Sequence, residues 1–130
     1  MASLKDFLVG FRVELKEAHY SNDLKDNSIP LNLDGKDSLQ IIGIENELLI
    51  SEYERQITSQ DGSLRIRVIL RVIAKIRDER QNEAEEIKKM IEENRNDFIA
   101  VAASEASLII ANLTKSAGFL PLITQPAFME

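Results

Sequence analysis

Side chains that could carry acid–base chemistry are scarce in this sequence. The single histidine, His19, would need a nucleophile or a second acid within reach to act as a catalytic base, and no local motif supplies either. There is no glycine-rich phosphate loop, paired-carboxylate motif or Ser-His-Asp signature. His19 is therefore interpreted as a structural or surface residue, and we expect no enzymatic activity. A small enzyme whose site forms across subunits is the weaker alternative.

Two charged groups could bind ions or nucleic acid. The glutamates at 83–93 lack the alternating pattern and the glycine of a calcium loop, and they are typical of a solvated helix face. Arg65, Arg67 and Arg71 could attract phosphate, but neighbouring glutamates can neutralise them. A net charge of -6 also argues against a general nucleic-acid binder. We expect no metal, no cofactor and no nucleic acid.

The length of 130 residues fits a single domain spanning 1–130, with 44% hydrophobic residues to form its core. The N-terminus carries Asp6 and no long apolar run, so it does not indicate a secretory signal. The most apolar run, Phe98 to Leu113, is shorter than the roughly 20 residues of a membrane span, and we expect none. The lack of cysteine is compatible with a reducing cytoplasm, where we expect the protein to be.

The first element that could position a site is a strand. Odd positions from Phe7 to Leu15 are apolar, which predicts a strand, and the change of phase near Lys16 to Ala18 predicts a bulge.

A hairpin is predicted further along the chain. Residues 21–38 are interpreted as a loop, and 39–57 as one extended region with a bend at Gly43. A turn at 58–63 then leads to a strand over 64–77. Its even positions should face the helices, with Ile69 and Ile73 facing away. Acidic residues of the hairpin partner should pair with its arginines: Glu45, Glu47, Glu52 and Glu54.

Helical spacing replaces this alternation after Asp78. Residues 84–91 predict an amphipathic helix, and a polar stretch at 94–97 is either a turn or part of one long helix. Beyond it, a stripe of large apolar residues begins at Phe98, beside a second stripe of small residues. We therefore predict an α+β fold, with an antiparallel sheet of three or four long strands and C-terminal helices packed on one face.

The C-terminal segment 118–128 is apolar and contains Pro121 and Pro126, so it cannot be a central strand. It should lie on an apolar surface of its own domain or of a partner subunit. The alternative is that it simply covers the core.

The helix end at 113–122 and the close Gln125-Pro126-Ala127-Phe128 resemble the C-terminus of the protein-export chaperone SecB. The opening strand, with 14–21 reading Glu-Leu-Lys-Glu-Ala-His-Tyr-Ser, is similar to the first strand of that family. The resemblance implies a SecB-like domain with a four-stranded antiparallel sheet and two helices on one side. It also implies an ATP-independent holdase that binds unfolded or extended clients in apolar grooves, in protein export or toxin–antitoxin control. SecA or an antitoxin is then a candidate partner.

The expected client site combines the second extended region with the C-terminal segment. Its residues are Ile41, Ile42, Ile44, Phe119, Leu120, Leu122 and Ile123. The small-residue stripe, with Ile69 and Ile73, predicts a homo-oligomer, either a tetramer or a dimer. The alternative function is a non-catalytic structural or regulatory oligomer whose grooves are filled by its own tail.

Overall fold

The computed structural model describes residues 3–22 and 33–116. After the short helix α1 (Leu4–Phe7), four strands form one antiparallel sheet in the order β1-β4-β3-β2. The strands are β1 (Leu8–Asn22), β2 (Leu33–Glu45), β3 (Leu48–Ser59) and β4 (Leu64–Ile76). A 3-10 turn, η1 (Asp78–Arg80), leads to the helices α2 (Ala84–Glu93) and α3 (Arg95–Ser116). The predicted α+β class is confirmed, and the sheet has four strands.

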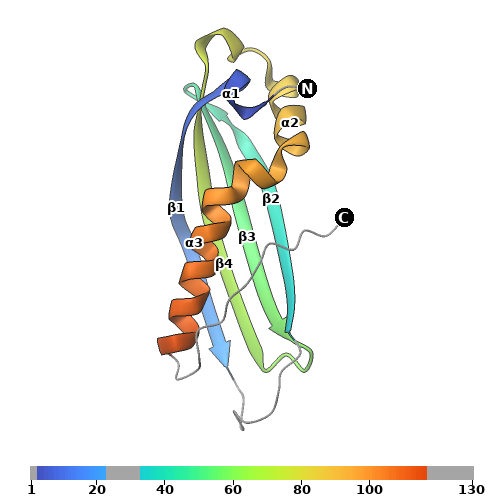
Figure 1. Ribbon diagram of the computed structural model, residues 1–130, viewed down its shortest axis with the longest axis vertical. Coiled ribbons are helices and arrows are strands. Elements are labelled where there is room, and N and C mark those ends of the chain that lie inside the picture. Colours follow the sequence, from blue (N-terminus) through green and yellow to red (C-terminus); the bar gives the residue numbers. More distant parts are fainter. Residues whose placement is uncertain (1–2, 23–32, 117–130) are drawn as a thin grey trace.

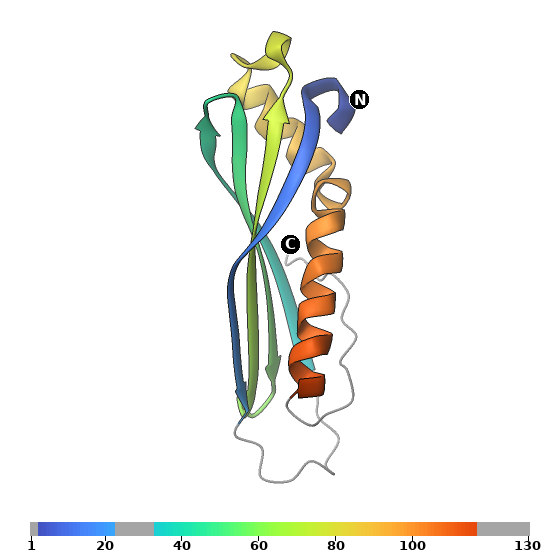
Figure 2. The same cartoon turned by 90° about the vertical axis from the view of Figure 1, so that its left-hand side faces the viewer.

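The helices cover one face of the twisted sheet and leave the other bare (Figures 1 and 2). In Figure 1, α3 runs along the sheet, whereas α2 lies toward one end of β2. The core between the two layers is mainly aliphatic, with α3 contributing Phe98, Ile99 and Ile110 to it. Burial of such side chains is the main stabilising contribution to a fold of this size.

The faces of β4 are as the alternation predicts. Every even position from Leu64 to Ile76 is buried beneath the helices. Ile69 lies on the bare face, but only 6% of its surface is exposed. Lys16 of β1 reaches over β4 to Glu52 of β3, with Nζ 2.8 Å from Oε2. Ile69 is thus covered within its own chain, and it is not the exposed apolar residue that the oligomer prediction assumed.

The extended region predicted at 39–57 is in fact two strands. A tight turn at Asn46 and Glu47, with φ of 50° and 70°, joins β2 to β3. β2 also begins at Leu33, so its first residues are not the loop that was expected. Glu45 therefore ends β2 and Glu47 lies in the turn, and neither lies opposite the arginines of β4. The predicted pairing of glutamates with the arginines of β4 holds for Glu52 and Glu54. Glu52 lies opposite Arg71, and Oε1 of Glu54 lies 2.5 Å from Nε of Arg67.

Two irregularities in the strands are close to their predicted places, whereas a further register shift between Leu8 and Gly10 of β1 was not predicted. The β1–β4 register shifts between Leu15 and Glu17, which confirms the bulge near Lys16. In β2 the shift lies between Ile41 and Gly43, so the extra residue is Ile42. Gly62 has φ of 76° in the β3–β4 turn, a conformation that glycine adopts without strain.

The polar stretch after Glu93 ends one helix and starts another, because Asn94 has non-helical angles. The large-residue stripe of α3 is buried at Phe98, Ala102 and Ala106, whereas Ala100 and Ser104 of the small-residue stripe are exposed. Arg95–Lys115 is long and apolar enough to cross a membrane by length and composition, with a mean hydropathy of 1.4. One side of this helix packs on the sheet, and 39% of its apolar window is buried.

Candidate functional site

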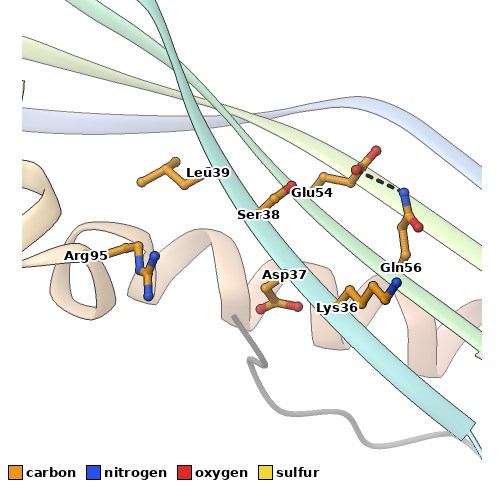
Figure 3. Close-up of a pocket in the computed structure, with 7 residues that line it drawn as sticks. All are labelled: Lys36, Asp37, Ser38, Leu39, Glu54, Gln56 and Arg95. Carbon is orange, nitrogen blue, oxygen red and sulfur yellow. Dashed lines mark hydrogen bonds between the residues drawn. The ribbon is translucent and has the colours of Figure 1, made fainter. Parts of the chain in front are cut away.

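A groove borders the edge strand β2. Its larger part lies where β2 faces the junction of α2 and α3, and its smaller part reaches the bare face of the sheet, where Glu54 and Gln56 lie. The groove consists of two cavities of about 540 and 340 Å³ that share Leu39 and Arg95. We call them together the β2 groove. The larger cavity is lined by Leu39, Gln40, Ile41, Lys88, Ile91, Glu92 and Arg95. The smaller one is lined by Lys36, Asp37, Ser38, Leu39, Glu54, Gln56 and Arg95 (Figure 3).

The local sequence explains why the groove opens here. Ile87, Met90 and Ile91 fix α2 on the core through one face, and the helix break at Asn94 then starts α3 in a new direction. Leu39 and Ile41 lie on the helix-facing side of β2 and are half-buried against the core. Among the residues that the structure describes, β2 pairs only with β3, so no described strand covers the backbone on its other side.

A buried polar cluster lies beside the smaller cavity. Asp37 is the only buried side chain of β2, at 4% exposure, and it accepts two hydrogen bonds from the fully buried Arg55. Nε of Arg55 lies 3.1 Å from Oδ1 of Asp37, and Nη2 lies 3.2 Å from Oδ2. Nη1 of Arg55 also donates to Ser107 of α3 at 2.6 Å. The cluster therefore joins β2, β3 and α3.

Tyr53 completes this cluster by donating its hydroxyl hydrogen to Asp37. Burial of the ring, together with this hydrogen bond, raises the pKa of the Tyr53 hydroxyl well above its ordinary value. A buried Asp–Arg pair with additional hydrogen bonds is costly to break, because either partner alone would be an uncompensated charge. We interpret the cluster as the element that fixes β2 against the helix layer, and not as a catalytic centre.

The predicted client-binding residues are divided by the structure. Ile41 lines the β2 groove, Ile44 is half-buried against the core, and Ile42 is the bulged residue with 52% of its surface exposed. Phe119, Leu120, Leu122 and Ile123 lie outside the described residues. Sequence reasoning missed Leu39, Ile91 and Arg95 as groove residues. Of these three residues, only Ile91 belonged to a recognisable sequence pattern, the apolar spacing of a helix. That spacing predicted the buried face of the helix but not that the face would border a groove.

A second apolar surface lies at the opposite edge of the sheet. Phe11 and Leu15 of β1 point to the helix side, yet 47% and 55% of their surfaces are exposed. On α3, Val101 and Leu108 are exposed by 59% and 57%. The Phe11 ring meets Phe98 edge-to-face, with centroids 5.7 Å apart. β1 was predicted to have one buried face, but α3 covers it only in part.

His19 lies on the bare face of the sheet, with its Nε2 2.5 Å from Oε1 of Glu17. This hydrogen bond is the main cause that lowers the pKa of the Glu17 carboxyl. Within residues 3–22 and 33–116, no three His, Cys, Asp or Glu side chains gather where they could hold a metal ion.

Comparisons with known proteins bear on the fold. No family model matches the sequence, and no curated protein matches it. Among solved structures, the chain is similar to a SecB-like chaperone of Mycobacterium tuberculosis in complex with a ChAD peptide from an antitoxin. The TM-score is 0.66 at 10% identity, over 91% of this chain and 90% of that one. The chain has a SecB-like fold.

A protein of unknown function from Streptococcus agalactiae is also similar, with a TM-score of 0.49 at 13% identity. That similarity covers 90% of this chain and 99% of the other. The SecB-like arrangement agrees with the order of elements described above, in which a four-stranded antiparallel sheet precedes the two main helices.

Proposed function

We propose that this chain is an ATP-independent holdase-type chaperone, which binds unfolded or extended client polypeptides in the β2 groove. The observation that supports this most is the combination of a SecB-like fold with an open groove beside the edge strand β2, whose outer side pairs with no other described strand. The structural neighbour from M. tuberculosis is itself a SecB-like chaperone in complex with a peptide.

The physical properties of the groove suit an extended client. An extended peptide can add to a free strand edge through main-chain hydrogen bonds, which do not depend on its sequence. Leu39 and Ile41, which are only half-buried, provide apolar contacts for its side chains. Binding of this kind needs neither a nucleotide nor a metal, and we propose no catalytic role.

Two pathways are consistent with the proposal: protein export, with SecA as a partner, and toxin–antitoxin control, with an antitoxin as a partner. The neighbour's peptide comes from an antitoxin, which favours the second. We propose a cytoplasmic location in either case.

We further propose that the protein assembles as a homo-oligomer, either a dimer or a tetramer. Exposed apolar residues at Phe11, Leu15, Val101 and Leu108 support this, because large side chains of this type are commonly covered at subunit interfaces.

Suppression of aggregation tests the proposal. Ile41→Ser should reduce the protection that the chain gives to a chemically unfolded client, because a serine removes apolar contact from the groove. Ile50→Ser is the matched control, since Ile50 is also half-buried but lies on the bare face of the sheet, opposite Ile73. Circular dichroism should be unchanged in both variants.

The wild-type protein must protect the client at all for the proposal to stand. If it gives no protection while it is folded and oligomeric, the alternative is favoured. The protein would then be a non-catalytic structural or regulatory oligomer whose grooves are filled by its own tail. Equal loss of protection in both variants would show that the β2 groove is not the binding site.

A further inference from the structure

The edge strand β2 is regular along most of its length and irregular at one place. Up to Ile41, each of its residues lies opposite one residue of β3. The register then shifts between Ile41 and Gly43, which makes Ile42 an extra residue. Side chains keep their faces across this bulge, because Ile41 and Ile44, three positions apart, both pack against the core.

The bulge also divides the backbone groups on the outer side of β2, with which no described strand pairs. In a regular strand, the main-chain N–H and C=O groups of every second residue point to the same edge, about 6.6 Å apart. An extra residue breaks this spacing and disrupts the ladder locally. Because a regular client strand offers evenly spaced groups, it can pair continuously on one side of Ile42 but not across it.

The β2 groove ends at the same place as the regular part of the strand. On β2 the groove is lined by a continuous run from Lys36 to Ile41. Both faces of β2 contribute to this run, so the groove passes along the outer edge of the strand. The described residues of β2 beyond Ile41 line neither cavity, and Ile42 has 52% of its surface exposed. Side-chain contacts and evenly spaced main-chain groups therefore stop together.

We infer that the bulge at Ile42 is the end of the client site, so that an extended client segment pairs with β2 from Leu33 to Ile41 and no further. This inference rests on the proposed function and names the class of client for the same site. That class is an extended segment of about nine residues, or about 30 Å, with apolar side chains that contact Leu39 and Ile41. A longer extended chain gains no further pairing there.

The dependence of affinity on peptide length tests the inference. The probes are labelled peptides of roughly six, nine and twelve residues that repeat leucine and threonine, and fluorescence anisotropy gives their affinities for the full chain. Each added main-chain hydrogen bond strengthens binding by about two- to tenfold. The nine-residue peptide should therefore bind at least about fivefold tighter than the six-residue peptide. From nine to twelve residues, the affinity should change by less than about twofold.

Deletion of Ile42 provides the local test. Without this residue, Ile41, Gly43 and Ile44 alternate regularly, so each keeps its present face and the core is retained. The edge is then regular to the end of β2, and the twelve-residue peptide should bind at least about fivefold tighter than the nine-residue peptide. Ile42→Ala is the matched control, because it removes the same apolar side chain and leaves the bulge. Its length dependence should be that of the wild type.

Hydrogen exchange of single amides, followed by NMR, makes the test independent of the deletion. With the twelve-residue peptide bound to the wild-type chain, exchange should slow for outward amides between Leu33 and Ile41. It should stay unchanged from Gly43 to Glu45.

The outcomes separate the two proposals. If no peptide binds, or if binding slows no amide of β2, the proposed function of the β2 groove fails. If the peptides bind but the longest one protects amides on both sides of Ile42, the bulge does not end the client site. A folded deletion variant with the length dependence of the wild type refutes the inference as well.

Discussion

Replacement of Asp37 by asparagine tests whether the buried cluster holds β2 in place. The change keeps the shape of the side chain and removes its charge, which leaves the Arg55 guanidinium, with no exposed surface, without its anion. Breaking a buried ion pair in this way costs about 3–5 kcal/mol. A domain of this kind has a total stability of about 5–15 kcal/mol, so the loss should be large.

Urea denaturation measures the effect, at one fixed protein concentration so that any assembly is held constant. With an m-value of about 1–3 kcal/mol/M, the midpoint should fall by at least about 1 M. Asp34→Asn is the matched control, because Asp34 is an exposed aspartate of the same strand. It should change stability by less than about 0.5 kcal/mol.

The double variant Asp37→Leu with Arg55→Met adds a stricter condition. It removes both charges, so much of the stability lost in Asp37→Asn should return. The reasoning is refuted if Asp37→Asn is as stable as Asp34→Asn. It is also refuted if the double variant is no more stable than the two single losses predict by simple addition.

Three further predictions follow from the packing. The raised pKa of Tyr53 means that above about pH 10 the unfolded chain loses this proton while the folded chain keeps it. Stability should therefore fall with rising pH there, by up to about 1.4 kcal/mol per pH unit, and Tyr53→Phe should remove this slope in urea titrations. Leu70→Ala should cost about 2–5 kcal/mol in thermal or urea unfolding, because Leu70 is 1% exposed, whereas Arg71→Ala on the bare face should cost far less. Leu15→Ser should lower the molar mass measured by light scattering, whereas Ile42→Ser, equally exposed on the opposite edge strand, should not; a wild-type monomer at micromolar concentration would contradict the proposed assembly.

Local patterns were sufficient for much of the fold. The period of two in β4 predicted its buried face, and the change of phase at Lys16 predicted the bulge, because both depend only on neighbouring residues. The turn between β2 and β3 was missed since its left-handed residues, Asn46 and Glu47, include no glycine to mark it. The irregular alternation there also has a physical origin, because β3 turns polar Ser51 and Arg55 toward the core.

The candidate site was less accessible to sequence reasoning. Ile41 was expected in it from its apolar character, and it does line the β2 groove. Arg95 and Ile91 could not be assigned to the groove, because they approach Leu39 only after the helices fold back over the sheet. The surface at Phe11 and Leu15 was expected to be buried, since alternation shows which side of a strand is apolar but not how far a helix covers it.

The sequence by itself determined the class of the fold, the inward face of the central strand β4 and the amphipathic character of α2. Each of these follows from the spacing of apolar residues along one element. The tertiary structure decided that Arg55 is buried and that Ile69 is covered, although one is charged and the other lies on the bare face. A charge is buried only where another element supplies its partner, as β2 does for Arg55 through Asp37. The outward Ile69 is covered because it lies between Glu17 of β1 and Glu54 of β3 on the two neighbouring strands. Such contacts join residues far apart in the chain, so no local pattern can specify them.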